Sequence, residues 1–278
     1  MTNIKITKMH GCGNDFVFMD YEEYLKTNLS LEELSKKICD RHFGVGADGL
    51  IIPVEYKGDD ADIEWHYYNS DGTSAQMCGN GMRCFSRYVY DKKLVNKKQF
   101  SVKTLAGIIR PEILDNGLIR VNMGNPILKD ELIPFKGERN IKIQDKDFDI
   151  HPVSMGNPHC IIFTKECPLD MAKKYGPEIE KHPYFPEKTN VEFVKIISKN
   201  EVEMAVYERG CGITLACGTG ACATVVASVL NNLTDNNVKV NLPGGAVNIE
   251  WQGSASDSAK DVFLTGPAQY SFYADYIL

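Results

Sequence analysis

The sequence predicts an α/β protein of the α+β type: two pseudo-symmetric halves, each a mixed sheet or barrel around a central helix, with the active site in the cleft between them. Three observations support this. The length of 278 residues suits about two domains. Short apolar runs typical of strands recur along the whole chain. One motif, Cys-Gly-x-Gly leading into an apolar helical pattern, occurs at Cys78 and again at Cys217.

Matched segments before the two motifs indicate that a whole domain is duplicated. Asn69 and Glu208 each lie nine residues before their cysteine, and each follows a tyrosine. The segments Gly13-Asn14 and Gly156-Asn157 each precede an apolar strand pattern, and the offset between copies stays close to half the chain. A repeat of this length predicts two domains rather than a solenoid. We expect one half to comprise residues 1–122 and 266–278 and the other to comprise 123–265, with a crossover in 124–140.

Taken in order, the elements are many short strands with few helices. Strands are expected over residues 16–20, 50–56, 63–68, 100–104, 118–123, 160–163, 191–197, 202–207, 238–242, 246–251 and 262–264. A helix over 31–40 starts at the capping pair Ser30 and Glu33, and a second helical pattern covers 169–175. A long helix is expected after each Cys-Gly-x-Gly turn.

Composition excludes several classes of partner. The formal charge of −6 favours neither a nucleic-acid backbone nor an anionic membrane surface. The first residues lack the apolar core of a secretory signal. The uncharged stretch 210–234 contains several glycines and polar residues, so a buried helix is expected rather than a membrane span. Nine cysteines in a chain of this length favour reduced thiols and a cytoplasmic protein.

The cysteine and histidine spacings do not predict a metal site. No pair of cysteines has C-x-x-C spacing, and no HExxH or H-x₃₋₅-H pattern is present. A cysteine without a special context is usually a small buried hydrophobe, and this is the interpretation for Cys39, Cys84, Cys160, Cys167 and Cys222. Cys12 is interpreted as structural, and the role of Cys211 is left open.

Cys78 and Cys217 differ because each is expected at the N-terminus of a helix. There the helix dipole and the N–H groups of the first turn are expected to lower a thiol pKa and to hold an anion. Two such thiols on opposite sides of a bound molecule could remove a proton from one face of a carbon and deliver one to the other, without a cofactor. Gly79, Asn80, Gly218 and Thr219 would donate hydrogen bonds to a carboxylate beside that carbon.

The motifs, in order, resemble those of the diaminopimelate epimerase family. They are Met9-His-Gly-Cys-Gly-Asn-Asp-Phe, Phe43-Gly-Val-Gly-Ala-Asp-Gly, Tyr68-Asn-Ser-Asp-Gly, Met77-Cys-Gly-Asn-Gly-Met-Arg-Cys, Gly156-Asn-Pro-His, Thr189-Asn-Val-Glu-Phe, Tyr207-Glu-Arg-Gly and Ala216-Cys-Gly-Thr-Gly-Ala. The resemblance implies a pyridoxal-independent two-base epimerase that interconverts LL- and meso-2,6-diaminoheptanedioate on the route to lysine and peptidoglycan. It also implies a homodimer with no metal and no cofactor.

The resemblance assigns roles by matched position. Cys78 and Cys217 correspond to the acid–base pair, and Glu208 and His159 to residues that assist at the reacting centre. Polar contacts to the substrate fall on Asn14, Asn69, Gly79, Asn80, Asn157, Asn190, Glu208, Arg209, Gly218 and Thr219. Arg209 could pair the distal carboxylate in two-pronged fashion. Gly49 stands where many members carry a glutamine that touches substrate, which puts that one contact in doubt.

Three alternatives remain at this point. A proline or hydroxyproline racemase would share the two-thiol architecture but would need a small apolar pocket. A cysteine hydrolase would use one thiol with His159 as its base, leaving the second motif without a purpose. A non-enzymatic metal- or ligand-binding protein lacks the ligand spacing. The sequence does not assign either cysteine to one stereoisomer.

Overall fold

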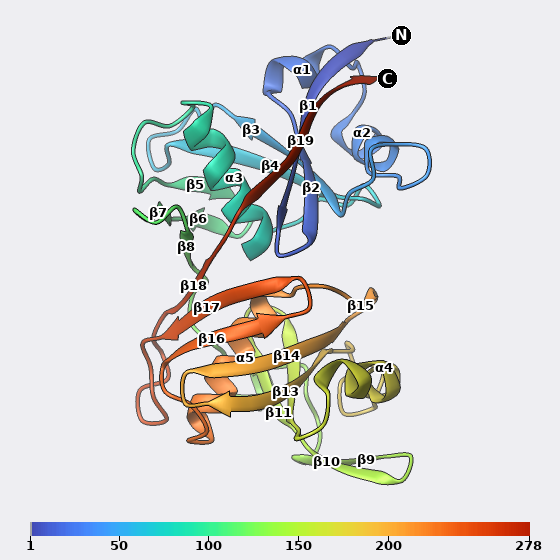
Figure 1. The fold of residues 1–278 in the computed structure, drawn as a ribbon, viewed down its shortest axis with the longest axis vertical. Helices are drawn as coiled ribbons and strands as arrows, with labels where there is room; N and C mark the ends of the chain where they lie inside the picture. The colour runs from blue at the N-terminus through green and yellow to red at the C-terminus, as the bar shows by residue number, and fades with distance from the viewer. Residues whose placement is uncertain (1) are drawn as a thin grey trace. The chain divides into compact units, whose positions relative to one another are not determined.

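The computed structural model describes residues 2–278, which divide into two compact units (Figure 1). Unit 1 contains the chain up to Val121 together with Gly266–Leu278, and unit 2 contains Asn122–Thr265. Each unit contains a set of paired strands and one long buried helix. Unit 2 is therefore inserted, in chain order, between two parts of unit 1.

The sheet of unit 1 has the order β19-β1-β2-β3-β4-β5-β6. Its strands are β1 (Asn3–Gly11), β2 (Asn14–Phe18), β3 (Gly49–Val54), β4 (Ile63–Asn69), β5 (Val102–Thr104), β6 (Gly107–Ile109) and β19 (Gln269–Ile277). The pairs β2–β3 and β4–β5 are parallel, and the other pairs are antiparallel. Strand β19 lies along β1, so the two chain ends are neighbours, as the blue and dark red strands of Figure 1 show.

The helices of unit 1 are α1 (Tyr21–Leu25), α2 (Leu31–Ile38) and α3 (Gly79–Asp91), followed by the hairpin β7 (Pro111–Ile113) and β8 (Ile119–Asn122). Helix α2 begins with the predicted capping box, because Ser30 Oγ accepts from Glu33 N–H and the Glu33 carboxylate accepts from Ser30 N–H. Helix α3 packs against β1, β2, β3 and β7 and is buried over most of its length.

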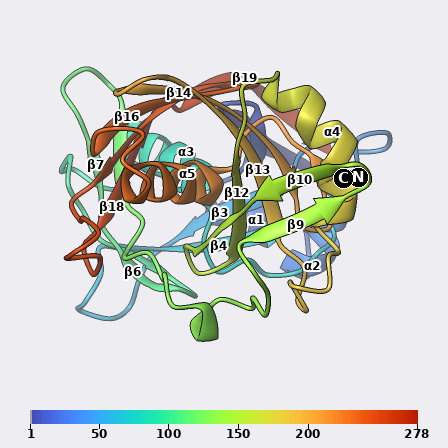
Figure 2. The same cartoon turned by 90° about the horizontal axis from the view of Figure 1, so that it is seen from below.

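The strands of unit 2 repeat this plan in the order β11-β12-β13-β14-β16-β17-β18, with β15 beside β14, as part of a ten-stranded sheet. The elements are η1 (Asp130–Leu132), β9 (Asn140–Ile143), β10 (Lys146–Asp149), β11 (His151–Ser154), β12 (Pro158–Phe163), α4 (Pro168–Ile179), β13 (Asn190–Ser198), β14 (Glu201–Glu208), β15 (Gly212–Ile213), α5 (Gly218–Leu230), β16 (Asn237–Leu242), β17 (Gly245–Trp251) and β18 (Val262–Gly266). Figure 2 looks along this unit and shows α5 among the strands that it contacts.

Strand directions match between the units and confirm the predicted fold class. The parallel pairs β2–β3 and β4–β5 of unit 1 correspond to the parallel pairs β12–β13 and β14–β16 of unit 2. In each unit an antiparallel strand precedes the first parallel pair, and a helix lies between its two strands. Helices α3 and α5 occupy equivalent places in the two chain orders, each starting immediately after a Cys-Gly-x-Gly cysteine.

The uncharged stretch 210–234 contains a buried helix, as predicted. Helix α5 has 13 residues, and Ala221 to Ala227 are almost completely buried. Small and β-branched side chains let the surrounding strands approach the helix closely. Across residues 2–278, no helix has the length and apolar character needed to cross a membrane.

The sequence analysis did not predict every element: α1 and the short strands β6, β7, β9, β10, β11 and β15 were not expected. Strands β1 and β19 were not expected, because their apolar pattern is interrupted by charged residues such as Lys8, which is nevertheless buried. The expectation that Cys167 is buried is wrong: it lies exposed in the turn before α4, at the N-cap position ahead of Pro168. Cys39, Cys84, Cys160 and Cys222 are buried, as predicted.

Candidate active site

Cys78 caps the N-terminus of α3, as the sequence predicts. Its backbone is extended (φ −145°, ψ 117°), and its Sγ accepts a hydrogen bond from Gly81 N–H at 3.4 Å. The thiol is half-buried. Because the first N–H groups of a helix have no intrahelical acceptor, Gly79 and Asn80 present donors beside this sulfur.

Asn14 lies against Cys78 with its amide orientation fixed from behind. Its Nδ2 donates to Asp48 Oδ2 at 2.6 Å, so Oδ1 faces the helix. There Oδ1 accepts from Asn80 Nδ2 at 3.2 Å and from the Cys78 thiol at 3.5 Å. The motif around Gly49 thus supplies Asp48, a second residue that orients Asn14. Sequence reasoning did not assign this role to Asp48.

Asp48 belongs to a charged network on the same side of unit 1. Arg41 Nη2 pairs with Asp48 at 2.8 Å and with Asp15 at 3.0 Å, and Lys8 Nζ pairs with Asp15 at 2.7 Å. Burial tends to raise the pKa of Asp15, but the bonds from Lys8 and Arg41 outweigh it and hold that pKa below its usual value. The turn that positions Asn14 is therefore held by a buried ion pair.

Asn69 lies at the end of β4, directly opposite Gly49 on β3. Its Nδ2 donates to Thr73 Oγ1 at 3.0 Å, and its backbone N–H donates to Thr73 O. A side chain at Gly49 would collide with Tyr67 and Tyr68, because a Cβ there would lie 2.5 Å from Tyr67 Cε2. Glycine at this position therefore has a packing reason in this chain.

Arg83 is a fully buried cation one turn into α3. Its Nε donates to Pro267 O at 3.1 Å, Nη1 to Gly79 O at 3.4 Å and Nη2 to Cys12 Sγ at 3.8 Å. One side chain thus joins the helix start, the Cys12 turn and the segment that re-enters unit 1. The sequence interpretation assigned Arg83 no role, although the residue lies inside the Cys78 motif.

Cys217 caps α5 with nearly the same geometry (φ −124°, ψ 111°) and is 5% exposed. Its Sγ accepts from Gly220 N–H at 3.4 Å and lies 3.5 Å from Thr219 Oγ1. Asn157 Nδ2 donates to the same Thr219 hydroxyl at 3.3 Å. Five of the predicted residues, namely Asn157, His159, Cys217, Gly218 and Thr219, therefore meet at the start of one helix.

The expectation of a lowered thiol pKa is wrong for Cys217, because burial outweighs the effect of the helix N-terminus. Burial raises the pKa of this thiol well above its usual range, and the carboxylates of Glu208 and Glu192 raise it further. The Thr219 hydroxyl and the Gly220 N–H act in the opposite direction but do not compensate. This shift favours the thiol form of Cys217, the form that can deliver a proton.

Glu208 ends β14 close to Cys217, and its carboxylate accepts from the Thr214 hydroxyl. Burial raises the pKa of Glu208 above its usual value, the Thr214 bond lowers it, and the charge of Glu192 raises it again. A carboxyl with a raised pKa beside a neutral thiol can exchange a proton with it at lower cost than an ordinary carboxylate can.

His159 is completely buried and is bound on both ring nitrogens. Nδ1 lies 2.7 Å from Glu192 Oε1, and Nε2 lies 3.1 Å from Asn157 Oδ1. Glu192 is also completely buried. Glu192 was not predicted as a site residue. A charged residue between Val191 and Phe193, within an apolar strand pattern, was the signal that could have identified it.

Asn190 and Arg209 have structural partners in unit 2. Asn190 donates to Pro158 O at 2.8 Å and accepts from Arg209 N–H at 3.0 Å, so both ends of its amide bind backbone. Arg209 itself is exposed, with Nη1 donating to Glu187 O at 3.3 Å. Asn190 thus fixes the turn that presents the Arg209 guanidinium.

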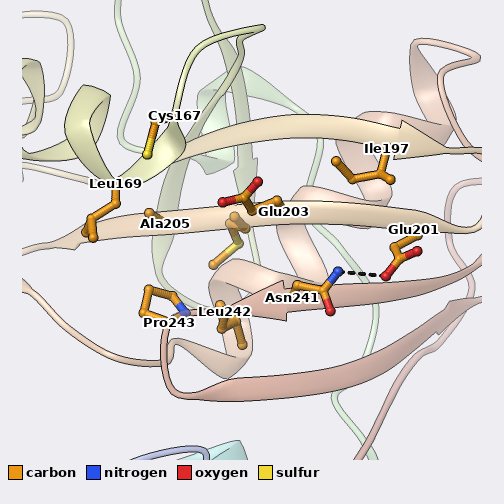
Figure 3. Close-up of a pocket in the computed structure, with 10 residues that line it drawn as sticks. Cys167, Leu169, Ile197, Glu201, Glu203, Ala205, Asn241, Leu242 and Pro243 are labelled. Atoms are coloured by element: carbon orange, nitrogen blue, oxygen red, sulfur yellow. Dashed lines mark hydrogen bonds between the residues drawn. The ribbon is translucent and has the colours of Figure 1, made fainter.

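Two further features of unit 2 bear on ligand binding. His159, Glu192 and Cys217 place possible metal-ligand atoms within 4.8 Å of one another, but the His159–Glu192 hydrogen bond occupies two of them. A separate hollow of about 470 Å³ is lined by β13, β14 and β16, with Asn241 Nδ2 bound to Glu201 Oε1 at 2.9 Å (Figure 3). This hollow is lined by none of the predicted site residues.

Comparison with known proteins identifies similar chains. A family model described as diaminopimelate epimerase matches residues 6–129 and 152–271. The diaminopimelate epimerase of Halothermothrix orenii is 47% identical over 278 residues, covering 96% of this chain and 95% of the relative.

Two solved structures share the fold at low sequence identity. One is a Bacillus anthracis phenazine biosynthesis protein of the PhzF family, with a TM-score of 0.75, 18% identity and full coverage of both chains. The other is a hydroxyproline epimerase from Agrobacterium vitis, with a TM-score of 0.72, 13% identity and coverage of 100% of this chain and 93% of that one.

Proposed function

Because this chain belongs to the diaminopimelate epimerase family, we propose that it interconverts LL- and meso-2,6-diaminoheptanedioate by two-base proton transfer at Cα between Cys78 and Cys217. One observation carries the proposal: the two cysteines cap equivalent helices of a duplicated fold. The reaction supplies a precursor for lysine and peptidoglycan synthesis.

In each direction one sulfur acts as a thiolate and the other as a thiol. The thiolate takes the Cα proton, and the thiol delivers its own proton to the opposite face of the same carbon. The two cysteines thereby exchange protonation states during one turnover, and no cofactor is required. The raised pKa of Cys217 favours its thiol form in the free protein, and Glu208 can accept that proton when the direction reverses.

The low acidity of a Cα–H beside a carboxylate is the main chemical obstacle. Hydrogen-bond donors fixed before the reaction stabilise the enolate-like charge that develops when the proton leaves. Gly79 and Asn80 on α3, with Gly218 and Thr219 on α5, provide these donors at the two helix starts. We assign Asn14, Asn69, Asn157 and Asn190 to binding and orienting the substrate, directly or through the contacts described above.

The polar groups away from the two cysteines suit a long zwitterionic substrate with two carboxylates. Asn190 holds the backbone N–H of Arg209, and the exposed guanidinium of Arg209 can pair a distal carboxylate. A proline or hydroxyproline substrate has no second carboxylate to use this arginine. Fold similarity to a hydroxyproline epimerase therefore does not move the substrate assignment.

Compartment and assembly complete the proposal. Nine cysteines in a chain of this length favour reduced thiols, which suits the reducing cytoplasm. We also propose a homodimer. Its support is the edge strand β19, on which Phe272, Tyr273 and Ile277 are 44%, 67% and 65% exposed, because exposed apolar side chains on an edge strand mark an association surface.

The test is exchange of the Cα proton in heavy water. With LL-diaminopimelate and no added cofactor, deuterium should enter Cα as the stereocentre inverts. Cys78→Ala and Cys217→Ala should each abolish inversion, whereas Cys167→Ala, at an exposed cysteine, should retain it. Inversion at near wild-type rate in either single variant would refute the two-base proposal.

The same experiment separates the alternatives. Racemisation of proline alone would overturn the substrate assignment and leave the mechanism intact. A cysteine hydrolase built on Cys217, His159 and Glu192 would keep its activity in Cys78→Ala and would show no exchange at Cα.

A further inference from the structure

Equivalent positions beneath the two cysteines have different chemistry. In unit 1, Phe16 pairs with Gly49 and Phe18 with Ile51 across β2 and β3. In unit 2, His159 pairs with Asn190 and Ile161 with Glu192 across β12 and β13.

Matching these strands places Phe16 at the position of His159 and Ile51 at the position of Glu192. The third residue of each helix, Gly81 in α3 and Gly220 in α5, supports the same correspondence. A Cβ on Gly81 would approach Ile51 and Phe16, and a Cβ on Gly220 would lie 2.6 Å from Glu192 Oε1.

Unit 1 therefore shows what the scaffold itself requires at these two positions. An aromatic and an aliphatic side chain fill them and leave Cys78 correctly placed at its helix N-cap. The buried carboxylate and imidazole of unit 2 are thus not needed to build this fold. Burying an ionised carboxylate is unfavourable unless it is paired, so the pair calls for another explanation.

The hydrogen bonds of unit 2 form a continuous path from this pair to the sulfur. Glu192 Oε1 meets His159 Nδ1, and His159 Nε2 meets Asn157 Oδ1. From Asn157 the path continues through Thr219 Oγ1 to Cys217 Sγ. A carboxylate oxygen and an amide oxygen both accept hydrogen bonds, so each of these two bonds requires a proton on the His159 nitrogen that it joins.

We propose that Glu192 is a positioning residue that holds a proton on His159 Nδ1 and fixes the orientation of the imidazole ring. Nε2 then faces Asn157 Oδ1, on the side of Cys217. In this arrangement Glu192 does not touch substrate, and its effect reaches the reaction through His159. The proposal rests on the proposed epimerase function, in which His159 assists at the reacting centre.

Two details of Glu192 support a positioning role over simple packing. Within the described chain, Glu192 Oε2 is buried and makes no hydrogen bond, so only one oxygen of the carboxylate has a hydrogen-bond partner. The titratable groups that face it are His159 on β12, Glu208 on β14, Cys217 at the α5 N-cap and Cys160 on β12. His159 is the one that closes a short hydrogen bond with it.

Nitrogen NMR on the whole protein tests for the Nδ1 proton without relying on catalysis. The protein labelled with ¹⁵N-histidine contains six histidines, and His159→Asn assigns the signals of His159. We expect Nδ1 of His159 to carry the proton that bonds to Glu192. A deprotonated Nδ1 in the wild-type protein would overturn the proposal, whether or not the protein epimerises diaminopimelate.

Kinetics of matched variants supply the second readout. Glu192→Gln keeps the side-chain shape, and we expect kcat to fall about 10–100-fold with a smaller change in KM, together with loss of the fixed Nδ1 proton signal. Glu192→Asp retains a carboxylate and should recover part of kcat. Glu203→Gln, on β14 of the same sheet, is the control and should leave kcat within about twofold of wild type, the scatter ordinary for a surface substitution.

The outcomes are distinguishable. If Glu192→Gln keeps kcat and the His159 signals unchanged, Glu192 is a packing residue and the proposal is wrong. If Glu192→Gln does not fold, the wild-type nitrogen signals and Glu192→Asp still decide it. If wild-type protein shows no Cα exchange, the proposed function fails, while the nitrogen NMR measurement still tests the role of Glu192.

Discussion

Replacing the buried Arg83 should destabilise the protein far more than replacing an exposed arginine on the same helix. The side chain is completely buried and makes one well-placed bond, to Pro267 O at 3.1 Å, and two longer ones, to Gly79 O and Cys12 Sγ. Arg83→Met removes all three. The matched control is Arg87→Met, one turn further along α3.

The size of the effect follows from these contacts. A hydrogen bond from a charged donor contributes about 1.5–3 kcal/mol net. We assign that free energy to the bond with Pro267 O, because the two longer bonds contribute little. Removing a buried charge is itself favourable and offsets part of this loss. We therefore expect Arg83→Met to lower the free energy of unfolding by about 2–3 kcal/mol.

The control rests on an exposed ion pair. Arg87 Nε pairs with Asp91 at 2.6 Å, with side chains 37% and 34% exposed. Such a pair contributes about 0–1 kcal/mol because water and salt screen it.

Thermal unfolding followed by circular dichroism measures the difference. At about 2–4 °C per kcal/mol for chains of this size, Arg83→Met should lower Tm by about 5–10 °C and Arg87→Met by no more than about 3 °C. Since Arg83 holds the start of α3, where Cys78 sits, its loss should also reduce kcat. Equal Tm values for the two variants would refute the reasoning, because the buried contacts would then contribute nothing beyond an exposed pair.

Three further predictions concern stability. The pKa of Asp15 is held low in the folded state, so the contribution of Asp15 to stability is complete above the unfolded pKa of about 3.9 and is lost as pH falls through the folded pKa. Asp15→Asn breaks the pair with Lys8, and it should cost about 1–3 kcal/mol at pH 7. It should also weaken the fall in stability toward acid pH, as measured by urea unfolding. Gly220→Ala should cost about 1–3 kcal/mol, because the new Cβ would collide with the buried carboxylate of Glu192. Gly81→Ala should cost less, because its Cβ would meet the flexible end of Ile51 at 3.2 Å. Equal urea midpoints for the two variants would contradict this. Ser30→Ala removes a capping box and should cost about 1 kcal/mol by the same assay, and an unchanged midpoint would show that the cap is not stabilising.

Local sequence signals predicted the parts of the site that depend on neighbours in the chain. The N-cap positions of Cys78 and Cys217 follow from glycines placed immediately before an apolar helical pattern. The capping box at Ser30 is equally local. The duplication was visible because three elements recur in order with similar gaps, and the repeated strand directions agree with it.

Features that depend on strand register were beyond the sequence. Glu192 and His159 are 33 residues apart, and they meet because β12 and β13 pair in parallel with a particular register. The sign of the Cys217 pKa shift was wrong because the helix N-terminus was visible in the sequence, whereas the burial that outweighs it was not. Arg83 was passed over for the same reason, since an arginine is usually solvated.

The pairing of β19 with β1 has a consequence for synthesis of the chain on the ribosome. Leu278 N donates to Thr2 O at 2.9 Å and Thr2 N donates to Leu278 O at 3.3 Å, beside the pairing of β19 with β1. Unit 1 therefore cannot complete its sheet until β19, which follows unit 2 in the chain, has been synthesised. Unit 2, though it is made later than most of unit 1, has all of its strands available earlier. We therefore expect unit 2 to complete its sheet before unit 1, the reverse of the usual order in which the N-terminal domain folds first.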